Sequence, residues 1–195
     1  MEPLLIYESR TLKTITSKDG EVFTIILGLS KVLIEQLKAH SLDVSDTDLQ
    51  ANTSDRQRFG EGSYEEWYGK DRTPYALVDH AGKLAALAWF GPKPLGRKSL
   101  RYLSAEERAQ ELQQQTGEWH TIVYRSYNPY RGRGLMTPFM RYVIADYKKR
   151  YPHARLWAGI STKNEASIGL AKRFGFIESV EHSDPKAKWC AMIEQ

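Results

Sequence analysis

A short run of glycine and arginine, Tyr130-Arg131-Gly132-Arg133-Gly134-Leu135, has the residue types of a phosphate-binding site. Glycine lets the backbone approach a ligand closely, and the first N–H groups of a helix have no partner within that helix. The helix dipole favours negative charge at the same end. The amides of Gly132 to Met136 are therefore predicted to bind a pyrophosphate, with Arg131 and Arg133 beside them. An ordinary tight turn with two solvated arginines is the alternative interpretation.

The flanking residues predict the elements that would position this run. His120 to Tyr124 is rich in β-branched and aromatic residues, which is typical of a strand. After the run, apolar residues recur every four positions, which predicts a helix that ends at Tyr151-Pro152. Ala154 to Ile160 is predicted to be a further strand and Asn164 to Phe174 a further helix, with Gly175 as its cap. The apolar faces are Leu135, Phe139, Val143 and Tyr147 in the first helix, and Ala166, Leu170 and Phe174 in the second.

With these two motifs in this order, the chain resembles the GNAT superfamily of acyl-CoA N-acyltransferases, specifically over about residues 118 to 180. The family pattern R/Q-x-x-G-x-G/A falls on Arg131, Gly134 and Met136, and Met136 departs from the small residue usual there. The second family segment, a strand, an asparagine, a helix and L-G-F, is matched through Asn164 and Phe174-Gly175-Phe176. The resemblance implies an α/β (α+β) fold. Its central sheet would be mixed, mostly antiparallel, flanked by helices and splayed between the fourth and fifth strands.

The resemblance also implies a co-substrate, acetyl-CoA or another acyl-CoA, and no metal. In family members, backbone amides at the positions of Tyr124 to Ser126 orient the pantetheine and the thioester carbonyl. The residues that the resemblance assigns to acyl-CoA binding are Arg125, Ser126, Arg131, Gly132, Arg133, Gly134, Leu135, Met136, Asn164 and Arg173.

Two proton-transfer groups that are usual in the family are missing here. The position of the general acid, often tyrosine, is Ala171, and that of a frequent glutamate base is Gly159. The remaining candidates for catalysis are His120, Glu118 and Tyr124. An imidazole with a pKa of about 6.5 is suited to take a proton at physiological pH. A structural or solvated histidine is the alternative interpretation for His120.

The amino-terminal half contains a predicted β-hairpin, Tyr75–Asp79 with Lys83–Phe90, around a turn at Asp79–Gly82. Strands are expected at Tyr7–Thr16 and Glu21–Leu27, and a helix at Ser30–Ala39 with a serine cap. Residues 41 to 72 have no long periodic pattern but hold many acidic residues. In the family this region covers the acceptor site, so an acidic loop would suit a cationic amine. Solvated surface charge is the other interpretation.

Charge is divided unevenly along the chain. The formal net charge is +4, yet residues 121 to 175 hold eleven Lys/Arg against two acids, so that stretch carries +9 and the remainder −5. A basic stretch fits capture of coenzyme A, which is a polyanion. A nucleic-acid-binding module is an alternative, although no nucleic-acid motif is visible.

The chain of 195 residues is expected to form a single domain, with an acceptor-side half at about 1–117 and an acyl-CoA-binding half at about 118–195. Its one cysteine, Cys190, excludes an internal disulfide framework. The start, Met1-Glu2-Pro3, lacks the pattern of a signal peptide, and no apolar run approaches the ~20 residues of a membrane span. A cytoplasmic protein is expected, without membrane or nucleic-acid partners.

The expected function is transfer of an acetyl or other short acyl group from coenzyme A to a primary amine of a small-molecule or peptide acceptor. The alternative within the fold is an acyl-CoA-binding protein that has lost catalysis, because Gly159 and Ala171 replace the usual proton-transfer groups. The sequence leaves open the acceptor, the acyl length and the oligomeric state.

Overall fold

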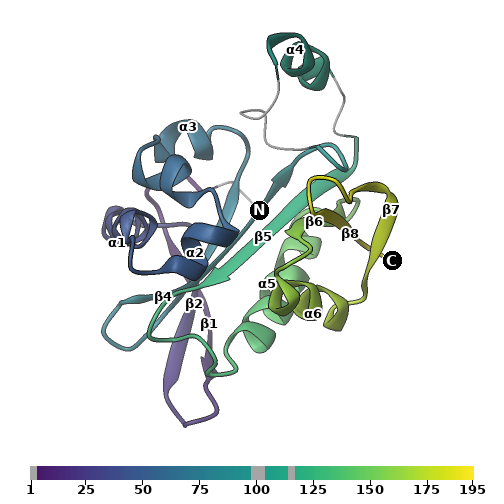
Figure 1. Ribbon diagram of the computed structural model, residues 1–195. Coiled ribbons are helices and arrows are strands. Elements are labelled where there is room, and N and C mark those ends of the chain that lie inside the picture. The colour runs from purple at the N-terminus through teal and green to yellow at the C-terminus, as the bar shows by residue number, and fades with distance from the viewer. Residues whose placement is uncertain (1–3, 98–103, 114–116) are drawn as a thin grey trace. The chain divides into compact units, whose positions relative to one another are not determined.

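The computed structural model describes residues 4–97, 104–113 and 117–195 (Figure 1). The chain divides into two compact units. The first unit comprises Met1–Phe90 with Tyr124–Arg150, and the second comprises Gly91–Val123 with Tyr151–Gln195. These units do not coincide with the expected halves at about 1–117 and 118–195. The expected single domain stays a prediction. Met1–Pro3, on which the signal-peptide expectation depends, lie outside the described residues.

Among the described residues, eight strands form one sheet in the order β1-β2-β3-β4-β5-β6-β8-β7. The pairs β1–β2, β2–β3, β3–β4, β6–β8 and β7–β8 are antiparallel, and β5–β6 is parallel. The expected mixed, mostly antiparallel sheet is therefore confirmed. The strands are β1 Arg10–Thr16, β2 Val22–Leu27, β3 Thr73–Val78, β4 Leu84–Pro92, β5 Trp119–Ser126, β6 Arg155–Ser161, β7 Phe176–Asp184 and β8 Trp189–Glu194.

The helices connect these strands. Ser30 caps α1, because its hydroxyl accepts a hydrogen bond from the Leu33 N–H at 3.4 Å, as the serine cap predicted. The helical elements are α1 Lys31–Leu42, α2 Thr47–Asn52, the π-helical turn η1 Arg56–Gly60, α3 Tyr64–Tyr68, α4 Ala105–Gln113, α5 Met136–Arg150 and α6 Glu165–Arg173. No helix in the described part of the chain is long and apolar enough to cross a membrane.

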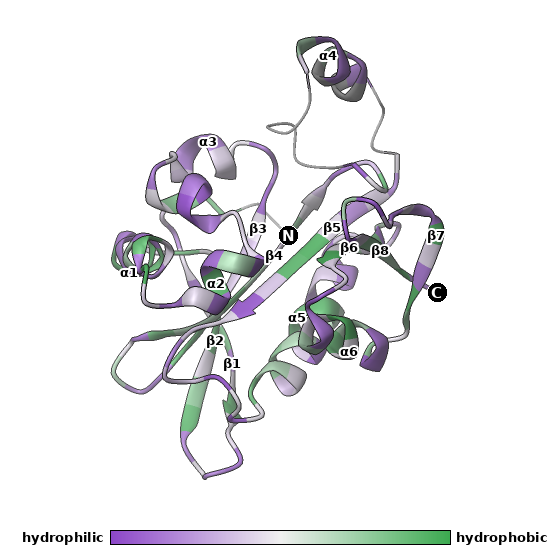
Figure 2. Cartoon of the chain, viewed as in Figure 1, coloured by the Kyte–Doolittle hydropathy of each residue, from purple (hydrophilic) through white to green (hydrophobic). Residues whose placement is uncertain are grey.

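In the first unit, helices cover both faces of the strands. Phe90 stacks on Tyr147 of α5 with ring centroids 4.2 Å apart, and Trp89, the preceding residue of β4, packs edge-on against Trp67 of α3. Because successive side chains of a strand point to opposite faces, α5 and α3 lie on opposite sides of β4. Figure 1 shows α1, α2 and α3 grouped together. Figure 2 shows β2 as hydrophobic and the tip of the β1–β2 turn as hydrophilic.

The predicted face of α5 is the buried one. Leu135, Phe139, Val143 and Tyr147 are all almost inaccessible to solvent, with at most 3% of their surface exposed. Burying four large side chains on one stripe stabilises the helix, since packing rather than propensity supplies most helical stability. The helix starts at Met136, directly after the glycine-arginine run, as the sequence predicted.

In the second unit, β5 and β6 pair over three residues of each strand, Trp119–Thr121 with Arg155–Trp157. The indole N–H of Trp157 donates to the backbone oxygen of Lys93 at 2.9 Å. The expected splay between the fourth and fifth strands stays a prediction. In α6 the predicted face is wrong at Ala166, which is exposed, whereas Leu170 and Phe174 are half-buried. The buried residue of this short helix is Ala171, which the predicted face did not include.

Other sequence expectations differ from the structure in identifiable ways. The first strand begins at Arg10 rather than Tyr7, because Tyr7 has a positive φ of 70° that no strand tolerates. Residues 41–72 form α2, η1 and α3 instead of an irregular loop.

The β3–β4 turn is confirmed: Gly82 has φ 74°, and its N–H donates to the Asp79 oxygen at 3.0 Å.

Candidate functional site

The loop between β5 and α5 contains two glycines in a left-handed conformation. Gly132 has φ 77° and Gly134 has φ 75°, and both residues are exposed. A Cβ atom added at Gly132 would meet nothing within 4 Å, whereas one at Gly134 would lie 2.8 Å from Cε of Lys18. A ligand can therefore reach the backbone at Gly132, whereas the aliphatic part of the Lys18 side chain packs close to Gly134. We call this segment the glycine loop (residues 130–135).

The N–H groups of the glycine loop remain available for a ligand. Within the described part of the chain, the amides of Gly132, Gly134, Leu135 and Met136 have no acceptor in hydrogen-bonding geometry. The Leu135 side chain is buried and fixes the start of α5. Free N–H groups at a helix N-terminus, together with the positive end of the helix dipole, form a site that attracts an anion.

Arg131 holds the glycine loop in place. Its two Nη atoms donate to the two carboxylate oxygens of Asp46, each at 2.7 Å, and its Nε donates to the Ser126 oxygen at 3.0 Å. Asp46 is buried and also caps α2 by accepting from the Leu49 N–H at 3.0 Å. The bidentate pair ties the loop to α2 and to the end of β5. The charge of Arg131 is thus balanced by a carboxylate within the first unit.

Arg133 binds the β1–β2 hairpin. Its guanidinium donates to Asp19, with an Nε–Oδ2 distance of 3.1 Å, and also to Glu21. The hydrogen bonds that Arg133 donates to Glu21 and then to Asp19 raise its pKa above the ordinary value. The guanidinium also lies over the ring of Phe23, 5.5 Å from its centroid. The second arginine of the run is therefore paired with acidic residues as well.

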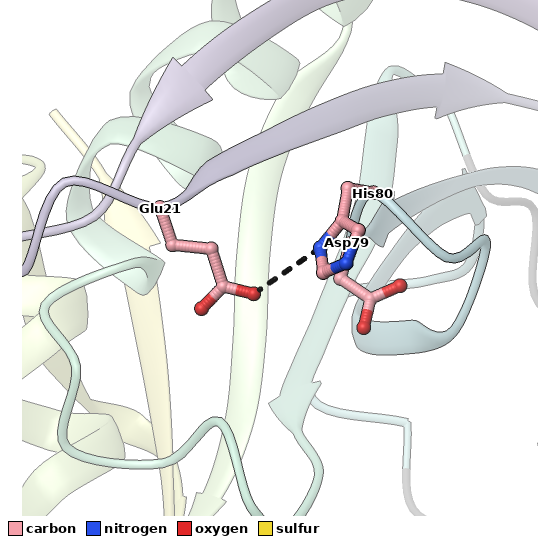
Figure 3. Close-up of side chains that lie close together, drawn as sticks. All are labelled: Glu21, Asp79 and His80. Carbon is pink, nitrogen blue, oxygen red and sulfur yellow. Dashed lines mark ion pairs between the residues drawn. The ribbon is translucent and has the colours of Figure 1, made fainter.

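Beside Arg133, three potential ligand atoms of Glu21, Asp79 and His80 lie within 4.8 Å of one another (Figure 3). Nδ1 of His80 is 3.6 Å from the Glu21 carboxylate. Asp79 accepts from the Tyr130 hydroxyl at 2.6 Å and from the backbone of Ala81 and Lys83. Burial favours the protonated acid, but these hydrogen bonds outweigh it and lower the pKa of Asp79. The group connects the glycine loop to two hairpin turns.

At the end of β5, side chains point into the first unit. Arg125 is 6% exposed and forms an ion pair with Asp55, which is fully buried. Tyr127 is also fully buried and stacks on His40 with ring centroids 4.3 Å apart. Burial raises the pKa of Tyr127 to about 12, so its phenol stays protonated. Because the Arg125 side chain is enclosed, an acyl-CoA ligand would meet the backbone of this strand and not the guanidinium.

The second unit holds the other predicted site residues. Glu118 is exposed, and its backbone oxygen accepts from the Arg155 N–H at 2.7 Å. His120 is half-buried, with its ring centroid 5.7 Å from that of Tyr151. Asn164 caps α6 through a hydrogen bond from the Ser167 N–H at 3.1 Å, and Arg173 is exposed in the last turn. The structure thus divides the predicted site residues between the two units, with Tyr124 and residues 125–136 in the first.

Comparison with known families decides the classification. A model of the acetyltransferase (GNAT) domain matches residues 42–177. The chain belongs to the GNAT acetyltransferase family. The resemblance seen in residues 118–180 is therefore confirmed, and the matched region extends well into the amino-terminal half. None of the curated proteins matches the sequence.

Solved structures share the GNAT fold at low sequence identity. The GNAT domain of PAT from S. lividans has a TM-score of 0.65 at 13% identity, covering 93% of this chain and 94% of that one. A GNAT-family acetyltransferase from Bordetella pertussis has a TM-score of 0.63 at 18% identity, covering 95% and 99%. The ribosomal-protein-S5-alanine acetyltransferase from Vibrio fischeri has a TM-score of 0.59 at 13% identity, covering 94% and 93%.

In this GNAT chain, the side chain of Trp189 lies against Gly159, the usual position of the glutamate base. A Cβ atom at Gly159 would lie 2.5 Å from Cζ2 of Trp189, so the indole occupies the space that a side chain would need. Ala171, at the usual position of the tyrosine acid, is buried. Neither position can supply a proton in this structure.

Sequence reasoning missed the acidic partners of the arginines. Asp19, Glu21, Asp46 and Asp55 come from the segment before β3, far from the glycine loop in sequence. The sequence held one sign of these ion pairs, because residues 121–175 are basic and the rest of the chain is acidic. Periodicity could not show which carboxylate meets which arginine.

Proposed function

We propose that this GNAT chain transfers an acetyl group, or another short acyl group, from coenzyme A to a primary amine. The proposal is carried by the glycine loop, where N–H groups without an acceptor among the described residues lie at the start of α5. These groups suit the pyrophosphate of acyl-CoA, because they donate hydrogen bonds at the positive end of a helix dipole. Arg131 and Arg133 then act by holding the loop in the binding conformation.

In this reaction the neutral amine attacks the thioester carbonyl, and the tetrahedral intermediate expels the coenzyme A thiol. The amine needs a proton acceptor, the carbonyl oxygen needs hydrogen-bond donors, and the leaving sulfur needs a proton. We assign the carbonyl donors to backbone N–H groups of Tyr124 to Ser126. His120, Glu118 and Tyr124 are the proposed proton-transfer groups. Holding the reactants close together supplies much of the rate.

The proposed acceptor is a small-molecule or peptide amine. The Vibrio fischeri neighbour is named for acetylation of an alanine of ribosomal protein S5, which is a peptide acceptor. We place the reaction in the cytoplasm, where a single buried cysteine such as Cys190 would stay reduced.

The substitution Gly134→Glu tests the proposed acyl-CoA site. A carboxylate beside the free N–H groups would repel a pyrophosphate, so we expect acetyl-CoA affinity, measured by calorimetry, to fall at least about a hundredfold, or about 2.7 kcal/mol. Gly82→Glu is the matched control, because Gly82 is also exposed with a positive φ of 74° and lies in a different turn. Unchanged acetyl-CoA affinity in Gly134→Glu, with the fold retained, would refute the site.

A second candidate function is acyl-CoA binding without catalysis. It is favoured by Gly159, covered by Trp189, and by Ala171 at the usual position of the acid. Release of free thiol from acetyl-CoA over a panel of primary amines separates the two functions. Turnover on any amine that falls in His120→Ala supports the transferase. Tight acetyl-CoA binding with no turnover on the panel supports the inactive protein.

A further inference from the structure

A cavity of about 390 Å³ lies between α1 and the β3–β4 turn of the first unit. It is lined by Gln36, Ala39 and His40 from the helix and by Ala81 and Lys83 from the turn. Small-molecule sites are typically clefts of about 300–1,000 Å³. Ala39, Ala81 and Lys83 are exposed, so a ligand can enter from solvent. We call this site the α1 cavity, and all five lining residues lie outside the glycine loop.

Hydrogen bonds hold the two walls of the α1 cavity together. The Gln36 side chain donates from Nε2 to the Gly82 oxygen at 3.0 Å and accepts at Oε1 from the Leu84 N–H at 2.8 Å. Within the turn, the Asp79 carboxylate accepts from the Lys83 N–H at 2.8 Å. The cavity is therefore formed before a ligand arrives, which lowers the entropic cost of binding.

An imidazole ring supplies a flat surface in the α1 cavity. His40 stacks on Tyr127, with ring centroids 4.3 Å apart and planes inclined by 12°. Because Tyr127 is fully buried, the cavity is lined by the part of the His40 ring that Tyr127 does not cover. A planar aromatic ligand would extend this stack, since aromatic rings attract each other at centroid distances of about 4.5–7 Å. The small side chains of Ala39 and Ala81 leave room for such a ring.

The positive charge at the α1 cavity comes from Lys83. Its exposed side chain has no ion pair or hydrogen bond within the part of the chain that the structure describes. Burial lowers the pKa of His40, so the imidazole is neutral at pH 7 and does not add to this charge. Asp79, on the same turn, accepts from the Tyr130 hydroxyl at 2.6 Å and from backbone N–H groups instead. The cavity is therefore suited to a ligand with a negative charge.

From these features we infer that the α1 cavity binds a small aromatic carboxylic acid. The ligand ring stacks on the imidazole of His40, and the ligand carboxylate meets the ammonium of Lys83. This is a second binding site, separate from the acyl-CoA site at the glycine loop. The inference does not depend on the proposed acyl transfer.

Three probes separate the contribution of the ring from that of the charge. Naphthoate has both features, naphthamide keeps the ring without the charge, and cyclohexane carboxylate keeps the charge without a planar ring. Calorimetry with the full chain at low ionic strength measures the three affinities. We expect naphthoate to bind about three- to fivefold more tightly than naphthamide, the range for a contact with an exposed ammonium, and this ratio should fall in high salt. Naphthoate should also bind more tightly than cyclohexane carboxylate, because only naphthoate stacks on the imidazole.

Substitutions on the two walls locate these contacts. Lys83→Gln should reduce the ratio of naphthoate to naphthamide affinity to about one, whereas Lys83→Arg should keep the preference. Lys38→Gln is the matched control, because Lys38 is an exposed lysine of α1 that does not line the cavity. Ala39→Phe should fill the cavity and weaken both naphthalene probes at least about tenfold, since their rings lose buried contact area. Ala81→Phe fills it from the opposite wall if Ala39→Phe does not fold.

Acetyl-CoA affinity is measured on the same samples, because it tests the proposed function while naphthoate tests the α1 cavity. Equal binding of naphthoate and naphthamide, binding of neither, or an unchanged ratio in Lys83→Gln would overturn the inference. Equal binding of naphthoate and cyclohexane carboxylate would exclude an aromatic ligand. Complete displacement of naphthoate by acetyl-CoA would exclude a separate site. Absence of acetyl-CoA binding with the naphthoate preference intact would count against the proposed function alone.

Discussion

Arg131 and Arg133 are two neighbouring arginines of one loop, yet each meets an acidic residue 85 to 114 positions away. Asp46 is almost completely buried, whereas the partners of Arg133 are more exposed. A buried, bidentate pair resists solvent screening, and an exposed pair does not. At the scale of single residues, the ion pair of Arg131 with Asp46 is therefore expected to stabilise the glycine loop more than the ion pairs of Arg133 do.

Removing Asp46 should loosen the glycine loop. Asp46→Ala breaks the buried pair with Arg131 and removes the cap of α2, so we expect a loss of about 3 kcal/mol in the free energy of unfolding. Acetyl-CoA affinity should fall as well, since the glycine loop would lose the ion pair that holds it against α2. Urea unfolding and calorimetry measure the two effects. Asp46→Asn, which keeps a capping oxygen, should lose less stability, and equal losses would contradict an independent contribution of the cap.

His40 should make the folded protein sensitive to acid. Burial lowers the pKa of His40, although Asp43 and Asp46 act in the opposite direction. Above about pH 6.5 the imidazole is neutral in both states. As the pH falls below that value, the unfolded state takes up the proton first, so stability decreases until the pH passes the folded pKa.

The measurement for His40 is urea unfolding at pH 7.5, 6.5 and 5.5. We expect the wild-type protein to lose stability on acidification by less than about 1.4 kcal/mol per pH unit, the limit for one proton. His40→Phe, which keeps a ring against Tyr127, should show a shallower decrease over the same range. An identical decrease in both proteins would exclude His40 as the cause.

Gly159 and Trp189 form a pair in which the small residue makes room for the large one. Gly159→Ala should lower stability by about 1–3 kcal/mol, because its Cβ would press against the indole. Thermal unfolding measures the loss. Trp189→Leu should reduce the cost of a second substitution at Gly159. A Gly159→Ala protein as stable as wild type would contradict the close approach.

At the scale of elements, some helices and strands follow from the local sequence pattern, whereas others depend on tertiary contacts. β5, the turn of glycines and α5 follow from residues adjacent in sequence, so strand, turn and helix were predicted correctly. The helices α2 and α3 have six and five residues, too short to be stable alone. They depend on contacts such as Asp46 with Arg131 and Trp67 with Trp89, which no local period reveals.

The same reasoning explains the candidate site. The glycines and arginines of the loop were identified from their spacing, because an anion-binding helix start is a local feature. The contacts of Trp89 with Arg58, Arg72 and Trp67 join residues far apart in the chain, and nothing in the spacing of these residues marks them as neighbours. These contacts could be found only in the structure.

At the scale of the whole molecule, the uneven charge of the sequence is partly cancelled within the first unit. Arg125, Arg131 and Arg133 from the basic stretch pair with acidic residues of the amino-terminal part. Paired charges release few counterions when a polyanion binds, so this pairing opposes the nucleic-acid alternative.

Salt dependence tests that conclusion. We expect any nucleic-acid affinity of the wild-type protein to be weak and to fall with salt by a slope equivalent to no more than about two released ions. The double variant Asp19→Asn with Glu21→Gln unpairs Arg133 and should steepen the slope. Fluorescence anisotropy with a labelled DNA duplex between low and physiological salt measures both proteins. A steep slope in the wild type would favour a nucleic-acid-binding module.

The sequence by itself determined the order of strand, glycine loop and helix from Trp119 to Arg150, and with it membership of the GNAT family. These features are local, because hydrogen bonds and apolar periods act between residues a few positions apart. Only the tertiary structure decided which carboxylate each arginine meets and which rings lie together. Such contacts join residues far apart in the chain, and many pairings would satisfy the same composition.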